Sequence, residues 1–98
     1  MASRGTQKIL VEVKSFLGRS FITDLQAAIG QYVMYRDVIQ AQELGFTLYL
    51  AIAENVHSTG FQTPLAQLIL QQNQVNLLIF DAQQEILTQW ISTTITDN

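Results

Sequence analysis

Two periodicities in the apolar positions divide the chain into strands and helices. Lys8 to Lys14 alternates between the two faces of a strand, with Ile9, Val11 and Val13 on one side. This segment predicts a strand with one buried face and one charged face. Residues 46–53 are apolar on both faces, as expected of a strand inside a sheet that is covered on both sides.

Between these strands, the spacing of apolar residues predicts a long helix from Phe21 to about Gln42. The residues at three- and four-residue steps are Ile22, Leu25, Ile29, Tyr32 and Ile39. Ser20 is a favourable N-cap, and Gly45 suits the left-handed position that ends a helix. Gly30 in the interior costs about 0.5–1 kcal/mol relative to alanine, which suggests that a close backbone contact or a site requires it.

The second half of the chain predicts a loop, a helix and a hairpin. Pro64 fits the first turn of a helix that runs to about Gln72. Two further strands are joined by a short turn. The loop covers residues 54–63, the strands 75–80 and 85–91, and the turn 81–84, while 1–7 and 92–98 are expected to be flexible tails. The order strand–helix–strand predicts a right-handed parallel crossover.

These elements predict a single α/β domain over residues 1–98, in the order β-α-β-α-β-β. We expect a three-layer-like core in which a mixed sheet of about four strands is flanked by the long helix and the short one. Missing strands would leave an open sheet edge, which favours a homo-oligomer or a hetero-complex over a free monomer.

Composition narrows the class of protein. The chain has 98 residues, of which 48% are hydrophobic and 13% charged, which excludes intrinsic disorder. It contains no cysteine, so it has no disulfide framework and no thiolate zinc site. A net charge of −3 and a pI of about 4.7 argue against a general nucleic-acid binder. No membrane span or apolar signal-peptide core is present, and we expect a soluble, cytoplasmic protein without membrane contact.

Candidate chemistry begins with Glu12 and Lys14, which share one face of the first strand. A carboxylate there can help to hold Mg²⁺, and a lysine can orient water or stabilise developing charge during phosphodiester hydrolysis. Gln31 and Tyr35 are four residues apart on one helical face and could lie over the end of that strand. Taken singly, the first pair is equally compatible with a solvated strand face, and the second with a core tyrosine beside a surface glutamine.

In combination, a Glu-x-Lys strand followed by a Gln-x-x-x-Tyr helix resembles the second half of a PD-(D/E)xK nuclease core. Residues 8–91 further resemble the XisH family, the fdxN-element excision controlling factors of cyanobacteria. The stretches that carry this resemblance are KILVEVKSF (8–16), DLQAAIGQYVMYRDV (24–38), LYLAI (48–52) and LLIFDAQQEILTQWI (77–91). The resemblance implies a restriction-endonuclease-like (PD-(D/E)xK) partial core and a role in programmed DNA excision. It also implies a functional connection with XisI and with the site-specific recombinase XisF, with possible DNA contact.

The chain departs from the family pattern before Glu12. The family carries a helix and strands there, leading to the first aspartate of the motif, whereas no aspartate precedes Glu12 in this sequence. We therefore expect an N-terminally truncated domain whose catalytic set (Glu12, Lys14, Gln31 and Tyr35) is vestigial or incomplete, with Glu12 as the one metal ligand. No cofactor is expected unless Asp24, another subunit or a missing N-terminal segment completes a Mg²⁺ site.

Three interpretations remain open. The chain is an accessory factor that acts through protein contacts, a Mg²⁺-dependent nuclease with a completed site, or a fragment whose unpaired sheet edge favours self-association. We favour the first.

Overall fold

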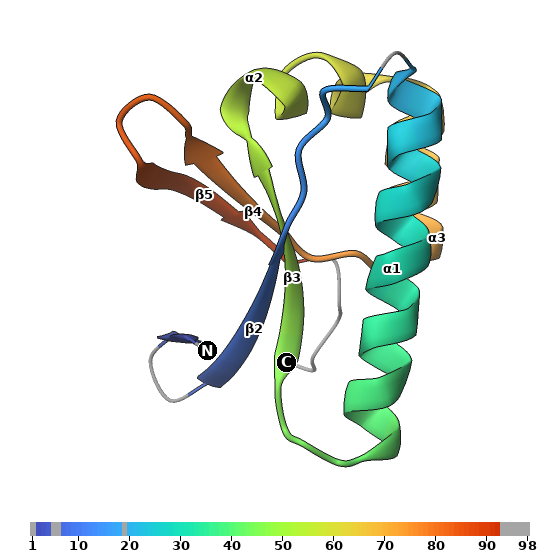
Figure 1. Ribbon diagram of the computed structural model, residues 1–98, viewed down its shortest axis with the longest axis vertical. Coiled ribbons are helices and arrows are strands. Elements are labelled where there is room, and N and C mark those ends of the chain that lie inside the picture. Colours follow the sequence, from blue (N-terminus) through green and yellow to red (C-terminus); the bar gives the residue numbers. More distant parts are fainter. Residues whose placement is uncertain (1, 5–6, 19, 93–98) are drawn as a thin grey trace.

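The structure is a computed structural model that describes residues 2–4, 7–18 and 20–92. Over these residues the chain forms a five-stranded mixed sheet in the order β1-β2-β3-β4-β5 (Figure 1). The strands are β1 (Ala2–Arg4), β2 (Gln7–Val13), β3 (Thr47–Ala53), β4 (Leu77–Asp81) and β5 (Ile86–Ile91). The helices are α1 (Phe21–Ala41), α2 (Glu54–His57), the 3-10 helix η1 (Gly60–Gln62) and α3 (Pro64–Gln72).

The predicted parallel crossover is confirmed, because β2, β3 and β4 are parallel neighbours. The hairpin is confirmed as well, with β5 antiparallel to β4. The sheet also contains a strand that the sequence did not predict: β1 pairs antiparallel with β2, in a segment that we expected to be part of a tail. Residues 93–98 of the other expected tail lie outside the described residues.

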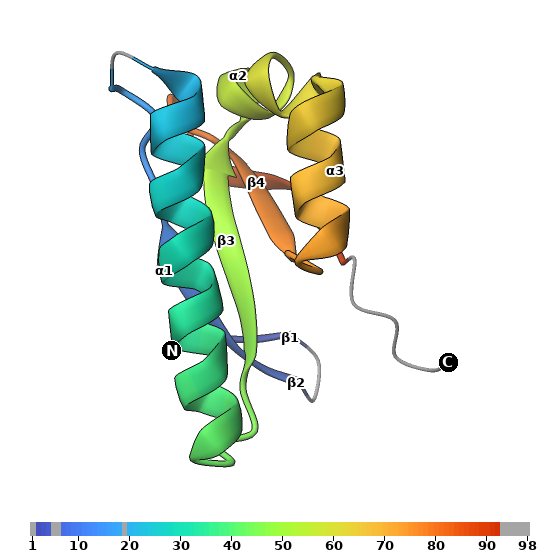
Figure 2. The same ribbon diagram turned by 90° about the vertical axis from the view of Figure 1, so that its right-hand side faces the viewer.

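The long helix α1 and the shorter α3 cover the same face of the sheet, as Figures 1 and 2 show. The crossovers β2–α1–β3 and β3–α3–β4 advance in one direction across the sheet. Since parallel crossovers are right-handed, two that advance in the same direction place their helices on one side. The expectation of a sheet covered on both sides, with three layers, is therefore wrong: the described residues form two layers.

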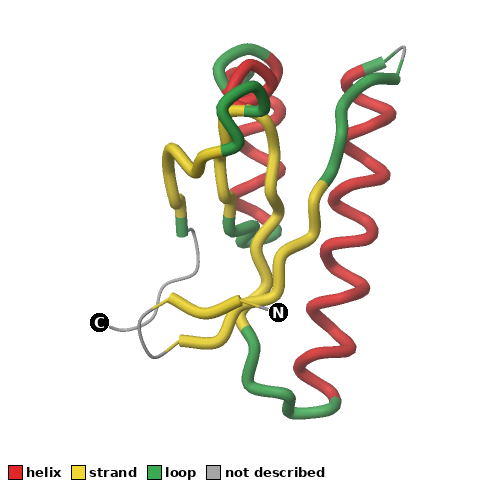
Figure 3. The backbone as a smooth tube through the Cα atoms, turned by 60° about the vertical axis from the view of Figure 1, so that its left-hand side comes forward, coloured by secondary structure: helices red, strands yellow, loops and turns green. Residues whose placement is uncertain are grey.

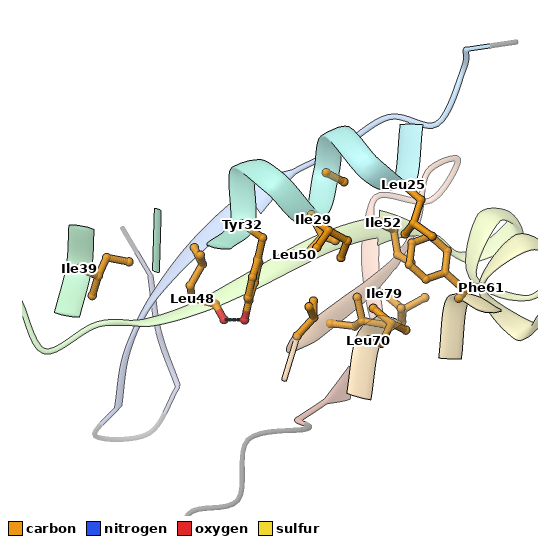
Figure 4. Packing of buried hydrophobic residues seen from close by; sticks show 14 residues of the cluster. Leu25, Ile29, Tyr32, Ile39, Leu48, Leu50, Ile52, Phe61, Leu70 and Ile79 are labelled. Atoms are coloured by element: carbon orange, nitrogen blue, oxygen red, sulfur yellow. Dashed lines mark hydrogen bonds between the residues drawn. The ribbon is translucent and has the colours of Figure 1, made fainter. Parts of the chain in front are cut away.

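The core lies between this sheet and the helices (Figure 4). It comprises Leu25, Ala28, Ile29, Tyr32, Ile39, Leu48, Leu50, Ile52, Phe61, Ala66, Leu70, Val75, Leu77 and Ile79. Four of the five helix positions predicted to be apolar contacts are buried here. The exception is Ile22, which is 41% exposed.

The ends of α1 are fixed by local hydrogen bonds. At the start, Ser20 Oγ accepts a hydrogen bond from the Thr23 N–H over 3.2 Å, which confirms the predicted N-cap. At the other end, the Leu44 N–H donates to the Ile39 carbonyl in a Schellman arrangement, and the left-handed residue is Glu43, with a φ of 52°. Gly45 does adopt the left-handed conformation predicted for it, with a φ of 75°, but it lies two residues beyond the residue that closes the helix.

The segment predicted to be a loop, residues 54–63, contains α2 and η1. Phe61 of η1 packs edge-on against Phe16 and Phe21, with ring centroids 5.2 and 5.3 Å apart. The contacts between these rings hold the connection after β2 against the first turn of α1. The path of the backbone from β2 into α1 can be followed in Figure 3. Downstream, α3 begins at Pro64 and ends at Gln72, as the sequence predicts.

The face of the sheet that the helices leave open is a concave apolar groove of about 420 Å³. The two edges of the sheet curl away from the helices on this side (Figure 1). The groove is lined by Ile9, Val11, Val13, Ala51, Leu78, Phe80, Leu87 and Trp90. At its rim Val13 is 62% exposed and Leu87 is 53% exposed. Across the described residues, no helix has the length and apolar character needed to traverse a lipid bilayer.

Candidate functional site

Glu12 and Lys14 lie on the face of β2 that α1 covers. Leu10 packs against the core under the helices, and side chains two residues apart on a strand share a face. The alternate residues Val11 and Val13 line the open groove instead. The predicted separation of the two faces is therefore confirmed, and Ile9 on the apolar face is buried as expected. Val13 on that face is 62% exposed, however, and the charged face is the one under the helix.

The end of β2 brings Lys14 against the middle of α1. The Lys14 backbone N–H donates to the Ala51 carbonyl over 3.0 Å, which continues the pairing with β3 by one residue. Its side chain points to the helix, where Nζ donates to Gln31 Oε1 over 3.4 Å. Two residues singled out from the sequence, on different elements, thus meet in a part-buried position.

The relative positions of Glu12 and Tyr35 follow from the same geometry. Two strand residues span about 6.6 Å and four helical residues about 6 Å, so a Glu-x-Lys strand and a Gln-x-x-x-Tyr helix that run in opposite directions stay in step. Since Lys14 meets Gln31, we expect Tyr35 to lie level with Glu12. Tyr35 is 40% exposed, so the notion that it is a core tyrosine does not apply. Glu12 is half-buried.

Asp24, a candidate for the second carboxylate, is engaged elsewhere. Its Oδ2 accepts a hydrogen bond from the Gly18 N–H over 2.9 Å. Asp24 also lies in the first turn of α1, where the helix dipole stabilises a carboxylate. The contact fixes the connection between β2 and α1, which accounts for the side chain without a metal.

The described residues do not fit a Mg²⁺ ion on their own. Nowhere in residues 2–4, 7–18 and 20–92 do three or more His, Cys, Asp or Glu side chains gather closely enough to hold a metal. At the site itself, Glu12 is the acidic residue that shares the face of β2 with Lys14. A single carboxylate, an ammonium and an amide can bind a polar group or an anion, but they form a weak magnesium site.

A second polar arrangement lies deeper in the core, and the sequence did not reveal it. The Tyr32 hydroxyl donates to the Leu48 carbonyl over 2.9 Å and accepts from the Asn76 N–H over 3.0 Å (Figure 4 shows the first contact). The buried side-chain amide of Asn76 also donates to the Leu48 carbonyl, and its Oδ1 accepts a hydrogen bond from the Ser92 hydroxyl. Burial raises the pKa of Tyr32 above its ordinary value. One polar residue inside the apolar run 75–80 was the signal for this network.

Arg36 also makes structural contacts. Its guanidinium donates to the Asn73 and Gln74 carbonyls at the C-terminal end of α3 and lies 5.5 Å from the centroid of the Tyr32 ring. A cation at this end of a helix is favourable, and the aromatic face adds to it. The side chain therefore locks α1 to α3.

The protein has an α/β fold with a mixed sheet, in which a long crossover helix faces a Glu-x-Lys strand. Comparison with known proteins identifies its family. The profile of the XisH family, described as XisH protein, matches residues 1–88. The chain belongs to the XisH family.

Two solved structures are similar to the chain. An XisH family protein from Nostoc punctiforme is 38% identical with a TM-score of 0.87, over 92% of this chain and 71% of that protein. An fdxN element excision controlling factor protein from Anabaena variabilis is 41% identical with a TM-score of 0.86, over 92% of this chain and 70% of that protein. Among curated proteins, none matches the chain.

Proposed function

We propose that the chain is an accessory factor in the programmed excision of a DNA element and acts through protein contacts in the cytoplasm. Membership of the XisH family supports the process, since one similar structure is named as an excision controlling factor. The partner that we propose is an XisI-like protein, with a site-specific recombinase acting in the same process.

The observation that carries this proposal is the open apolar groove. Sheets in small domains bury their apolar faces, and an exposed concave apolar surface of this kind is typical of a binding site for another protein. The residues that line it carry no charge, which disfavours a phosphate backbone as the bound group. An apolar helix or loop of a partner would fit this surface.

Co-purification with an XisI-like protein tests the proposal. We expect a complex with the wild-type chain and at least a tenfold loss of affinity in Val11→Asp, which places a carboxylate in the groove. Gln83→Asp is the matched control, since Gln83 is exposed in the β4–β5 turn and is not a groove residue. A folded wild-type chain that forms no complex would overturn the proposal.

A Mg²⁺-dependent nuclease is the alternative, and the pairing of β1 favours it. Ala2 pairs with Ile9 and Arg4 with Gln7, so extending β1 backwards in this register carries a strand past Glu12. A carboxylate on such a segment, or on another subunit, would complete a two-carboxylate metal site beside Lys14 and Gln31.

Plasmid DNA incubated with Mg²⁺ or Mn²⁺ separates the two functions. Under the accessory role, neither the wild-type chain nor Lys14→Ala cleaves the plasmid. Cleavage by the wild type that is lost in Lys14→Ala would establish the nuclease, whereas cleavage that persists in Lys14→Ala would arise from a contaminant.

A further inference from the structure

We propose that two copies of this chain pair through the outward face of α1, with the two helices antiparallel and crossing at Gly30. Gly30 is exposed, and a Cβ added there would meet nothing within 4 Å beyond its own helix and its chain neighbours. Nothing in the described part of the chain therefore explains a glycine in the interior of this helix. The close approach of a second backbone would explain it.

Gly30 is the centre of an apolar ridge. Residues four apart form a ridge along a helix, and here the ridge consists of Ile22, Gln26, Gly30, Met34 and Val38. The apolar side chains are 41% (Ile22), 65% (Met34) and 51% (Val38) exposed. A helix that covers a sheet normally presents a polar or charged stripe to solvent. This ridge carries no charge, so it has the character of a contact surface.

The ridge is complementary to itself. A two-fold axis at Gly30 places Ile22 of one copy level with Val38 of the other, and Gln26 level with Met34. Ridges of this spacing pack at a crossing angle of about 50°, and small central residues allow the closest approach of the axes, about 8 Å. Large side chains at both ends and a glycine in the middle suit this arrangement. No unrelated partner is needed to account for the symmetry.

Charge on this face also favours an antiparallel second copy. The outward face of α1 carries one charged residue, Asp37, which is exposed. In the antiparallel pair, Asp37 lies level with the uncharged Thr23 of the other α1. A parallel pair would place Asp37 against Asp37 instead.

The contact surface extends from α1 onto α3, where Leu65 is 49% exposed and Leu68 is 51% exposed, and a groove that Gly30 also lines runs between the helices. At a crossing of about 50°, the two α1 helices touch over the turns next to Gly30, so the contact is smaller than the ~800 Å² per partner of ordinary interfaces. We therefore expect a dimer that forms at high protein concentration.

Cysteine cross-linking tests this geometry directly, because the chain has no cysteine of its own. Under mild oxidation we expect an equimolar mixture of Gln26→Cys and Met34→Cys, which the antiparallel crossing places level with each other, to form a covalent dimer at least ten times faster than Gln83→Cys, which is exposed but remote from α1. Disulfides form between Cα atoms about 4.4–6.8 Å apart, which a close crossing at Gly30 provides for this pair. Equal rates for the mixture and for Gln83→Cys would overturn the proposal.

Sedimentation of the free chain gives the second test. We expect a dimer at roughly 100 µM and at least a tenfold higher dimer Kd for Gly30→Leu, with unchanged circular dichroism because a Cβ at this position meets nothing within 4 Å inside the chain and leucine favours the helix. A monomeric wild-type chain overturns the proposal. So does a dimer lost in Val11→Asp but kept in Gly30→Leu, which would place the contact in the sheet groove. Binding of the XisI-like protein is scored separately, and Gly30→Leu should retain it.

Discussion

The side chains of Lys14 and Gln31, seventeen residues apart in the chain, meet where β2 passes beneath α1, with 3.4 Å between Nζ and Oε1. This hydrogen bond is long and only part-buried, so it contributes little to folding. Its significance lies in its place next to Glu12, on the face of β2 that α1 covers.

Replacing Gln31 should therefore leave the fold intact. We expect Gln31→Ala to change the free energy of unfolding by less than about 1 kcal/mol, because neither partner is fully buried. Urea denaturation measures this change. A loss above about 2 kcal/mol would show that the pair is a structural element instead.

Removing the hydroxyl of Tyr32 should be much more costly. Tyr32→Phe leaves the buried Asn76 N–H without its acceptor, and an unsatisfied buried donor costs about 1–3 kcal/mol. Tyr35→Phe is the matched control, since that residue is 40% exposed, and we expect less than about 0.5 kcal/mol there. Equal effects of the two substitutions in urea denaturation would contradict the network described here.

Alkaline pH should act on the same residue. Burial raises the pKa of Tyr32 in the folded state, so the unfolded chain loses this proton first as the pH rises. Stability from this group is complete below about pH 10 and declines above it. Thermal unfolding measured between pH 8 and pH 11, in steps on the order of one pH unit, tests this. We expect the melting temperature of the wild type to fall more steeply with pH than that of Tyr32→Phe. Identical slopes would argue against burial of the phenol.

Two helix ends carry a side chain where glycine is preferred. Glu43 after α1 and Gln74 after α3 both have a φ of 52°. Because the left-handed conformation costs a residue with a Cβ roughly 1 kcal/mol, Glu43→Gly and Gln74→Gly should each raise the free energy of unfolding by about 0.5–1 kcal/mol. Gln42→Gly is the control, because Gln42 has a φ of −95° and gains nothing from glycine. Destabilisation by both left-handed substitutions would contradict these helix ends.

Gly60 should tolerate no side chain. A Cβ at this position would meet the ring of Phe21, which packs between Phe16 and Phe61. We expect Gly60→Ala to destabilise the protein by about 1–3 kcal/mol, as overpacking does. Gly30→Ala, where space is open, should stabilise the helix by about 0.5–1 kcal/mol in dilute solution. Similar melting temperatures for the two variants would contradict the packing of the aromatic cluster.

The sequence was informative about elements and less so about layers. The periods of α1, β3 and the hairpin predicted their existence, and Ser20 and Pro64 predicted where two helices begin. Alternation in β2 separated two faces, but an apolar face next to a helix and one next to solvent have the same pattern. Which face is covered depends on the direction of two successive crossovers, and that is a property of the whole sheet.

The sequence predicted some contacts of the candidate site and missed others. The helical spacing of Gln31 and Tyr35 indicated that both side chains could lie over the end of β2, and the structure brings Gln31 to Lys14 there. The engagement of Asp24 by the Gly18 N–H depends on how the connection after β2 folds back, which no period encodes. Asn76 was missed because one asparagine in an apolar run indicates a buried polar group only when its acceptors are known.

Our central proposal is that the described residues offer a single carboxylate, Glu12, at the site, and that the protein therefore works by binding and not by cutting DNA. Calorimetric titration of Mn²⁺ into the wild-type chain and into Glu12→Ala tests it most directly. We expect no saturable binding tighter than roughly millimolar, and no difference between the two proteins. Stoichiometric micromolar-range binding by the wild type that is lost in Glu12→Ala would contradict it.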